Sequence, residues 1–257
     1  MADQPAPVSS ASLSIARHGY VVSGFPVRGS GGGREGGSRT GGEGGVGCVR
    51  LDYDGVVLTP RFSDAFSYAL RAHAGQTKKG TAIPYIAHLM DVTALVLMHG
   101  GNEDEAVGAL LHDAAEDAGG RPRLDDIRQR FGDAVADIVE DCSDTLETPK
   151  PPWLQRKTAY IEHLPQVSAS TRLVSAADKT ANVRTIVADF KSIGGKVFER
   201  FAGRTHGTLW YYRTLADIFL RLGPVALARQ LDDTVRELQR LTGIEGGIAR
   251  PDPTCRT

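Results

Sequence analysis

Four ionisable side chains lie within six consecutive positions of the segment Leu110-Leu-His-Asp-Ala-Ala-Glu-Asp117. If this segment is helical, His112 shares a face with Glu116 and Asp113 shares one with Asp117, so all four groups line one helix edge. The alanines among them leave space above that edge, whereas a solvated face would carry long charged side chains. Burying an imidazole and three carboxylates without a cation costs several kcal/mol. The segment therefore predicts a cavity whose groups bind a divalent metal ion or transfer protons.

Two residues elsewhere in the chain extend this pattern. His88 ends the sequence Pro84-Tyr-Ile-Ala-His88, which stands 24 residues before His112 at the start of a predicted helix. Asp178 follows Asp113 by 65 residues and interrupts the apolar face of a long predicted helix. A carboxylate on an apolar face is unfavourable unless a positive group meets it. Both residues are therefore candidates for the same cavity.

The segments that must position these groups have the apolar spacing of helices. Asn102 and Glu105 predict a capping box at the start of one helix, and Gly132 separates two others. No segment alternates apolar and polar residues over the length of a strand. We expect an all-α fold with one core and about nine helices, over residues 61–73, 86–99, 102–118, 125–131, 133–142, 153–164, 169–190, 207–222 and 224–241.

Composition divides the chain into unequal parts. The net charge of −1 over 257 residues argues against a dedicated nucleic-acid or membrane-surface binder. From Gly29 to Gly47, 11 of 19 residues are glycine, so we expect residues 1–50 to be a disordered leader. Residues 51–243 then form the predicted structured domain, and 244–257 a loose tail. With no secretory signal, no membrane span and no CxxC pair, a cytoplasmic location is expected.

Together these motifs resemble those of the HD-domain metal-dependent phosphohydrolase superfamily. More narrowly, the sequence is similar to the hydrolase domain of RelA/SpoT-type (p)ppGpp enzymes and to stand-alone small alarmone hydrolases. The matching segments are Ala72-His-Ala-Gly-Gln76, Lys78-Lys-Gly80, Pro84-Tyr-Ile-Ala-His88, Leu110-Leu-His-Asp with Glu116-Asp117, and Ala177-Asp-Lys with Asn182-Val-Arg-Thr185. The resemblance implies an HD-domain helical bundle with one metal ion, usually Mn²⁺. The implied metal ligands are His88, His112, Asp113 and Asp178, a nitrogen and oxygen set that Zn²⁺ or Fe²⁺ also suits.

The resemblance also implies roles for the other motif residues. Glu116 and Asp117 match an acidic pair that would orient or deprotonate the attacking water and assist the leaving group. The residues implied to contact the nucleotide are Lys78, Lys79, Asn182, Arg184 and Thr185. The sequence departs from the family pattern at Thr180-Ala181, where the family more often has Leu-His.

Two further features are assigned to structure rather than to the site. His73 lies on the apolar face of the first predicted helix, which favours a structural, hydrogen-bonded role. The aromatic run Trp210-Tyr211-Tyr212 has helical spacing with neighbouring apolar residues and is predicted to belong to the core.

The implied function is that of a (p)ppGpp 3′-pyrophosphohydrolase without a synthetase, which converts ppGpp or pppGpp to GDP or GTP and pyrophosphate. Its expected partner is a small guanine nucleotide, with no DNA and no membrane, and the sequence indicates no oligomeric state. Two alternatives stay open. One is an HD-domain phosphatase for another nucleotide, such as a 5′-nucleotide or NADPH. The other is a non-catalytic, nucleotide-binding HD regulator, although a pure binder has no need of an acid pair.

Overall fold

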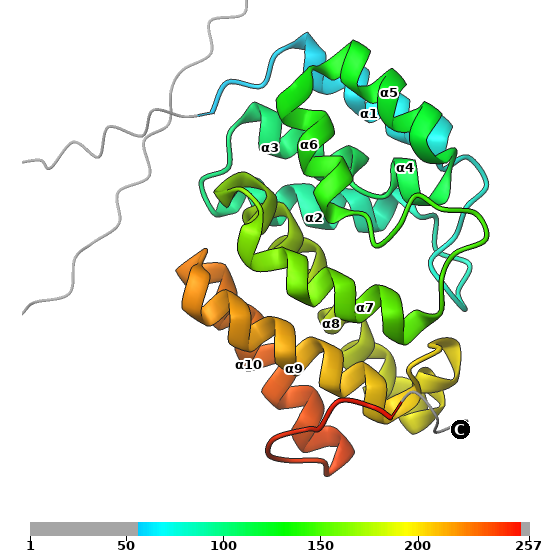
Figure 1. The fold of residues 1–257 in the computed structure, drawn as a ribbon, viewed down its shortest axis with the longest axis vertical. Helices are drawn as coiled ribbons and strands as arrows, with labels where there is room; N and C mark the ends of the chain where they lie inside the picture. The colour runs from blue at the N-terminus through cyan, green and yellow to red at the C-terminus, as the bar shows by residue number, and fades with distance from the viewer. Residues whose placement is uncertain (1–55, 253–257) are drawn as a thin grey trace, which may run out of the picture. The chain divides into compact units, whose positions relative to one another are not determined.

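A computed structural model describes residues 56–252 of the protein, and every regular element among them is a helix (Figure 1). The α-helices are α1 (Pro60–Ala72), α2 (Ile86–Met98), α3 (Glu103–Leu111), α4 (Ala114–Asp117), α5 (Gly120–Phe131), α6 (Asp133–Cys142), α7 (Trp153–His163), α8 (Ala169–Ile193), α9 (Arg204–Leu222) and α10 (Val225–Thr242). Two short 3₁₀ helices, η1 (Leu164–Gln166) and η2 (Gly194–Arg200), flank α8. The all-α prediction is confirmed, since strand pairing in the described residues is limited to one isolated bridge between Thr77 and Pro84.

The main departure from the predicted helices falls at His112 and Asp113. The helix predicted over residues 102–118 is divided into α3, which ends at Leu111, and α4, which begins at Ala114. The expectation that four ionisable groups line the edge of one continuous helix is therefore wrong. His112 and Asp113 lie at the junction, whereas Glu116 and Asp117 belong to the separate short helix that follows it.

Other helix boundaries follow local chemistry as predicted. The Asn102 side chain accepts from the backbone of Glu105, whose carboxylate accepts from the backbone of Asn102, so the capping box is confirmed. Gly132 separates α5 from α6 with φ 86° and ψ 171°. A residue with a Cβ atom rarely adopts this conformation, which explains the break at a glycine.

Helix α8 positions the site because it is packed on several sides. It contacts α2, α3 and α6 from the first half of the described chain, and α9 and α10 from the second half (Figure 1). Its buried residues are consequently spread around the helix and do not form a single amphipathic stripe. Asp178, near the middle of α8, is only 5% exposed.

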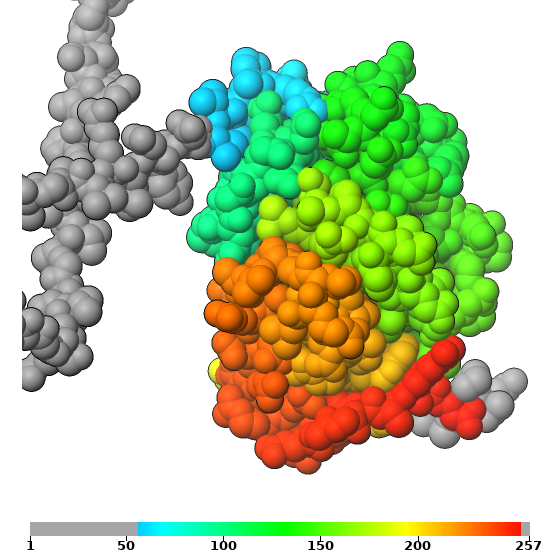
Figure 2. Space-filling view, turned by 60° about the vertical axis from the view of Figure 1, so that its left-hand side comes forward, coloured from blue at the N-terminus to red at the C-terminus, as the bar shows by residue number. Residues whose placement is uncertain are grey.

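The residues after α10 run back along the surface of the domain (Figure 2). Ile244 and Ile248 are partly buried against the larger hydrophobic core cluster, and the Gln239 amide donates to the carbonyl oxygen of Gly246. Residues 1–55 and 253–257 lie outside the described residues, so the predicted leader and the boundaries 1–50, 51–243 and 244–257 stay predictions. Within residues 56–252, no helix combines the length and the apolar content required to cross a membrane.

The backbone conformation of Gly132 provides a test of the fold. Gly132→Ala should lower the free energy of unfolding by about 1–3 kcal/mol, because alanine is strained at this φ and ψ. Gly195→Ala is the matched control, since Gly195 has no positive φ and its added Cβ would also meet open space. Urea denaturation measures both variants, and equal stability of the two would contradict the described break between α5 and α6.

Candidate active site

Two buried histidines and a buried aspartate converge from three helices. His88 lies in the first turn of α2, His112 caps the end of α3, and Asp178 lies on α8. The Nε2 atoms of His88 and His112 are 3.2 and 3.6 Å from Asp178 Oδ1. One potential ligand atom from each residue lies within 4.8 Å of the others. Three of the four implied metal ligands are thus brought together.

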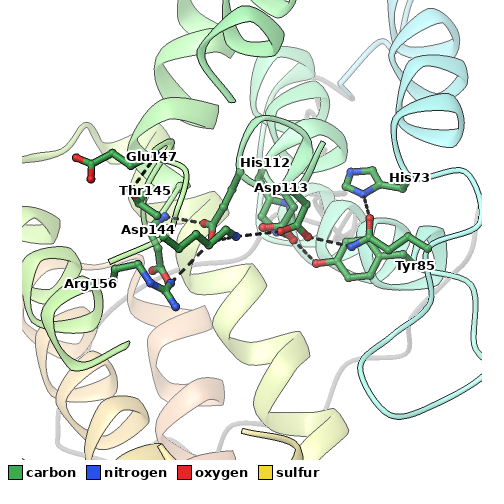
Figure 3. Close-up of polar contacts among 12 residues, drawn as sticks. His73, Tyr85, His112, Asp113, Asp144, Thr145, Glu147 and Arg156 are labelled. Atoms are coloured by element: carbon green, nitrogen blue, oxygen red, sulfur yellow. Dashed lines mark hydrogen bonds and ion pairs between the residues drawn. The ribbon is translucent and has the colours of Figure 1, made fainter. Parts of the chain in front are cut away.

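Asp113, the fourth implied ligand, faces the same point. Its Oδ2 atom is 2.9 Å from His112 Nε2 and 3.7 Å from His88 Nε2. The Tyr85 hydroxyl donates a hydrogen bond to this Oδ2 atom (Figure 3). Burial and the neighbouring Asp113 carboxylate raise the pKa of Tyr85, so its hydroxyl stays protonated and remains a donor. We call His88, His112, Asp113 and Asp178 the ligand cluster.

The chemistry of the ligand cluster fits a divalent cation. His112 Nδ1 is 2.8 Å from the carbonyl oxygen of Ala109, so Nδ1–H donates, and when the ring is neutral its Nε2 atom presents a lone pair. That buried Nε2 atom has no hydrogen-bond partner of suitable geometry among the described residues. Burial lowers the pKa of His112, but the Asp113 and Asp178 carboxylates outweigh burial and hold it well above its ordinary value. The cluster attracts positive charge, which a divalent ion can supply while the imidazoles stay neutral ligands.

A buried lysine that the sequence reasoning did not single out holds Asp178 from its other side. Lys179 Nζ donates to Asp178 Oδ2 over 2.6 Å and lies 4.7 Å from the centre of the Tyr160 ring. Burial lowers the pKa of Lys179, but the Asp178 carboxylate outweighs burial and holds that pKa well above its ordinary value. Asn182 donates to Asp178 Oδ1. The signal for Lys179 was its position beside an aspartate that directly follows the uncharged stretch of residues 173–177.

Glu116 and Asp117 form a separate group, which we call the acid pair. Glu116 accepts hydrogen bonds from the backbone N–H of Asp144 and from Lys150 Nζ, each over 2.8 Å (Figure 3). Asp117 accepts from Gln76 Nε2 over 2.9 Å and from Lys150 Nζ over 3.4 Å. Among the described residues, no side-chain hydrogen bond or ion pair joins the acid pair to the ligand cluster, and the two groups are linked through the backbone, where the N–H of Asp117 donates to the carbonyl oxygen of Asp113 over 3.0 Å. The break between α3 and α4 accounts for this separation.

The five implied nucleotide contacts lie in different surroundings. Lys78 Nζ donates to the Thr185 hydroxyl over 2.8 Å, which ties the loop before α2 to α8. Asn182 and Thr185 follow Asp178 by one and two turns and therefore share its face of α8, with Asn182 bonded to the Asp178 carboxylate. Arg184 lies on a different face of that helix and is exposed, without a hydrogen bond or ion pair to any described residue.

Lys79 borders a cavity of about 250 Å³ whose other lining residues were not predicted as site residues. These are Trp153, Arg156, Lys157, Phe201, Ala202, Thr208, Tyr211 and Tyr212. The aromatic run predicted as core is indeed buried, with Tyr211 4% exposed, yet Tyr211 and Tyr212 also form the cavity wall. Lys157 Nζ lies 4.7 Å from the centre of the Tyr211 ring. Cations beside aromatic rings suit a phosphorylated, planar ligand.

Comparison with known proteins identifies relatives of this chain. Residues 65–207, more than half of the chain, match the HD domain family. The guanosine-3′,5′-bis(diphosphate) 3′-pyrophosphohydrolase MESH1 of Xenopus tropicalis is 36% identical over 126 residues, which cover 48% of this chain and 68% of MESH1. Its counterpart in Homo sapiens is 35% identical with the same coverage. The bifunctional (p)ppGpp synthase/hydrolase SpoT of Escherichia coli K12 is 30% identical over 49% of this chain and 18% of SpoT.

Solved structures share the helical fold. The structure of a metazoan orthologue of SpoT that hydrolyses ppGpp covers 74% of this chain and 99% of its own, with a TM-score of 0.59 and 23% identity. The crystal structure of lmo0812 from Listeria monocytogenes covers 61% of this chain and 99% of its own, with a TM-score of 0.52 and 27% identity. The predicted HD-domain fold and family are therefore confirmed, and the chain belongs to the HD-domain phosphohydrolases related to the RelA/SpoT-type hydrolases.

Proposed function

We propose that this protein is a metal-dependent (p)ppGpp 3′-pyrophosphohydrolase. The observation that carries the proposal is the buried convergence of His88, His112 and Asp178, with Asp113 beside them, in a chain that is 36% identical over 48% of its length to a MESH1 protein named for that activity. Water is consumed in the reaction, the bond between the ribose 3′ oxygen and phosphorus breaks, and GDP or GTP leaves with pyrophosphate.

The ligand cluster would hold the divalent ion. Two imidazole nitrogens and two carboxylates, with no sulfur, suit Mn²⁺, and we propose Mn²⁺ as the resident ion. A bound divalent ion supplies positive charge that polarises a phosphoryl oxygen and favours ionisation of water. The protein's part is to keep the imidazoles in one orientation, which the hydrogen bond between His112 Nδ1 and the Ala109 carbonyl does directly.

The acid pair is proposed to move the protons of the reaction. The attacking water must lose a proton as its oxygen bonds to phosphorus, and the 3′ oxygen must gain one as it leaves. Glu116 and Asp117 are adjacent carboxylates, both held by Lys150, whose positive charge offsets part of theirs. One carboxylate would accept the water proton, and the pair would return a proton to the 3′ oxygen.

The cavity bordered by Lys79 is proposed to take part in holding the nucleotide. Arg156 and Lys157 share one carboxylate, that of Asp144, so the two cations keep a net positive charge for phosphate, and Tyr211 provides an aromatic face. We also propose that four further residues contact the substrate: Lys78, Asn182, Arg184 and Thr185. The position of Asn182 and Thr185 on the Asp178 face of α8 supports their part in it.

A nucleotide panel tests the proposed function. Mn²⁺-loaded protein is incubated with ppGpp, pppGpp, GMP, deoxynucleoside monophosphates and NADPH, and the products are separated by ion exchange. Release of pyrophosphate with GDP or GTP is the expected result, because attack occurs at the phosphorus bonded to the 3′ oxygen. Orthophosphate alone, from any of the substrates, would contradict the proposal and favour a phosphatase for another nucleotide. Tight binding without turnover would favour a regulator.

Substitutions in the site test the proposed roles. Asp113→Ala should reduce kcat by at least about 100-fold, since it removes a ligand that lies within 3.7 Å of both histidines. Glu116→Ala and Asp117→Ala should also reduce kcat strongly, whereas Asp125→Ala, at an exposed position of α5, serves as the control. Full activity of both acid-pair variants would show that the proposed proton transfer is wrong even if the reaction is right.

Removal of the metal should destabilise the domain. The ligand cluster concentrates buried carboxylates that a divalent ion neutralises, so Mn²⁺ at about 100 times its Kd should stabilise the fold by about 2.7 kcal/mol. Thermal unfolding before and after treatment with a chelator measures this difference. Asp178→Asn should lose most of the Mn²⁺-dependent shift, while Asp125→Asn should keep it. A shift of the same size in both variants would place the ion elsewhere.

The cavity wall is tested through Lys157. Lys157→Gln should raise KM for ppGpp by about tenfold or more, because it removes a half-buried cation that lines the cavity and that pairs with Asp144 in the absence of phosphate. Lys196→Gln removes an equal charge from an exposed position of η2 and is the matched control. Steady-state kinetics with both variants give the comparison, and an unchanged KM for Lys157→Gln would exclude this cavity from substrate binding.

A further inference from the structure

Two hydrogen bonds in series connect a buried histidine to the acid pair (Figure 3). His73 Nδ1 is 2.7 Å from Gln76 Oε1, and Gln76 Nε2 is 2.9 Å from Asp117 Oδ2. His73 is only 5% exposed and follows the last residue of α1, whereas Asp117 ends α4. The series therefore joins two parts of the chain that are 41 residues apart at the Gln76–Asp117 contact.

The direction of each hydrogen bond follows from the groups involved. A carboxylate only accepts, so the Gln76 amide must turn its N–H groups towards Asp117. Its oxygen then faces His73, and the His73 Nδ1 atom must carry the hydrogen that it donates. His73 Nε2 is buried without a hydrogen-bond partner among the described residues, which is consistent with a neutral ring protonated at Nδ1. The hydrogen bonds to Asp117 and to His73 protonated at Nδ1 thus require the same orientation of the glutamine amide.

The backbone of Gln76 is held as firmly as its side chain. Its N–H donates to the carbonyl oxygen of His73 over 3.0 Å, and its carbonyl oxygen accepts from the backbone of Tyr85 over 2.9 Å. The Gln76 side-chain amide therefore extends towards Asp117 from a backbone that two hydrogen bonds hold in place. Lys150, the other partner of Asp117, is further away at 3.4 Å and has a side chain that is 41% exposed. Gln76 consequently constrains Asp117 more closely than Lys150 does.

The stacking of His73 on Tyr85 connects this series of hydrogen bonds to the ligand cluster. The rings of His73 and Tyr85 are stacked, with centroids 5.0 Å apart and planes inclined by 29°. Tyr85 donates its hydroxyl hydrogen to Asp113 Oδ2, and His73 directs the Gln76 amide towards Asp117. One stacked pair therefore supports a hydrogen bond to a carboxylate of each group, although no hydrogen bond or ion pair joins the side chains of the ligand cluster to those of the acid pair.

We propose that Gln76, oriented by His73, is a positioning residue that sets the direction of the Asp117 carboxylate for proton transfer. The inference rests on the proposed function, because it assumes that Asp117 takes part in the reaction. Gln76 does not contact the ligand cluster and need not touch the substrate. Its effect is exerted through Asp117 and belongs to the chemical step rather than to substrate binding.

Kinetics of Gln76 variants test this role. Gln76→Met keeps the length of the side chain and removes its donor, so kcat should fall about 10- to 100-fold while KM changes less than about twofold. The matched control is Gln166→Met, because the exposed Gln166 amide donates only to the carbonyl oxygen of Glu162. Thermal unfolding should give similar Tm values for wild type and both variants. A wild-type kcat for Gln76→Met would overturn the proposal.

A double-mutant cycle separates positioning from a general structural effect. In an Asp117→Ala background, Gln76→Met should cause no further loss of kcat in single-turnover measurements, because the residue through which Gln76 acts is gone. His73→Asn, whose amide can still donate to Gln76 Oε1, should retain most of the activity, whereas His73→Leu should behave like Gln76→Met. An equal loss with and without Asp117, or equal losses for both His73 variants, would overturn the proposal.

The experiments distinguish failure of the positioning role from failure of the proposed function. The whole series is measured on whichever nucleotide the wild-type protein hydrolyses fastest. If this substrate releases pyrophosphate and Gln76→Met is fully active, only the positioning role is wrong. If the products are different but the Gln76 and Asp117 effects are coupled, the reaction is misassigned and the positioning role is retained. If no nucleotide of the panel is hydrolysed, both proposals are wrong.

Discussion

Two imidazoles and two carboxylates meet in the interior of this protein, and much of the surrounding structure compensates for the cost of placing them there. Asp178 Oδ1 faces His88 and His112, while its Oδ2 atom binds the Lys179 ammonium. Asp113 faces the same histidines and accepts from Tyr85. Each carboxylate therefore has a partner of its own besides the histidines. Negative charge remains uncompensated between the two Nε2 atoms and the carboxylate oxygens that face them. A divalent ion at that position would balance it.

The break between α3 and α4 divides the site into two chemical compartments. Had the segment been one straight helix, His112 and Glu116 would share an edge and compete for the same neighbours. Because of the break, His112 and Asp113 face the other members of the ligand cluster. Glu116 and Asp117 instead bond to Lys150 and Gln76. Carboxylates proposed to bind a cation and carboxylates proposed to exchange protons need different surroundings, and the interrupted helix provides both within six residues.

Features set by local sequence could be predicted, whereas those set by tertiary contacts could not. The capping box at Asn102 and the boundary at Gly132 depend on neighbouring residues only, and both were predicted. Alanine, leucine and glutamate all favour helix, so the pattern of residues 109–117 predicts a continuous one. Its interruption accompanies contacts of His112 and Asp113 with α2 and α8, which lie far away in the sequence.

The same distinction applies to individual site residues. The convergence of His88, His112 and Asp178 agrees with the ligand set implied by family resemblance. Lys157 and Tyr211 carry no local mark of a site, because helical spacing assigns Tyr211 to the core and a single lysine is unremarkable in any helix. Only the packing of α7 against α9 brings the two together at one cavity.

Lys179 links Asp178 of the ligand cluster to an aromatic ring of α7. A buried ammonium is stable only beside a negative charge, and Asp178 provides it. The same ammonium lies over the Tyr160 ring, and its charge opposes the rise that burial causes in the pKa of Tyr211. Because Lys179 cannot leave Asp178 without exposing an uncompensated charge, the ring beneath it is held in place as well. The positions of Asp178 on α8 and of the Tyr160 ring on α7 are therefore maintained by the same ion pair.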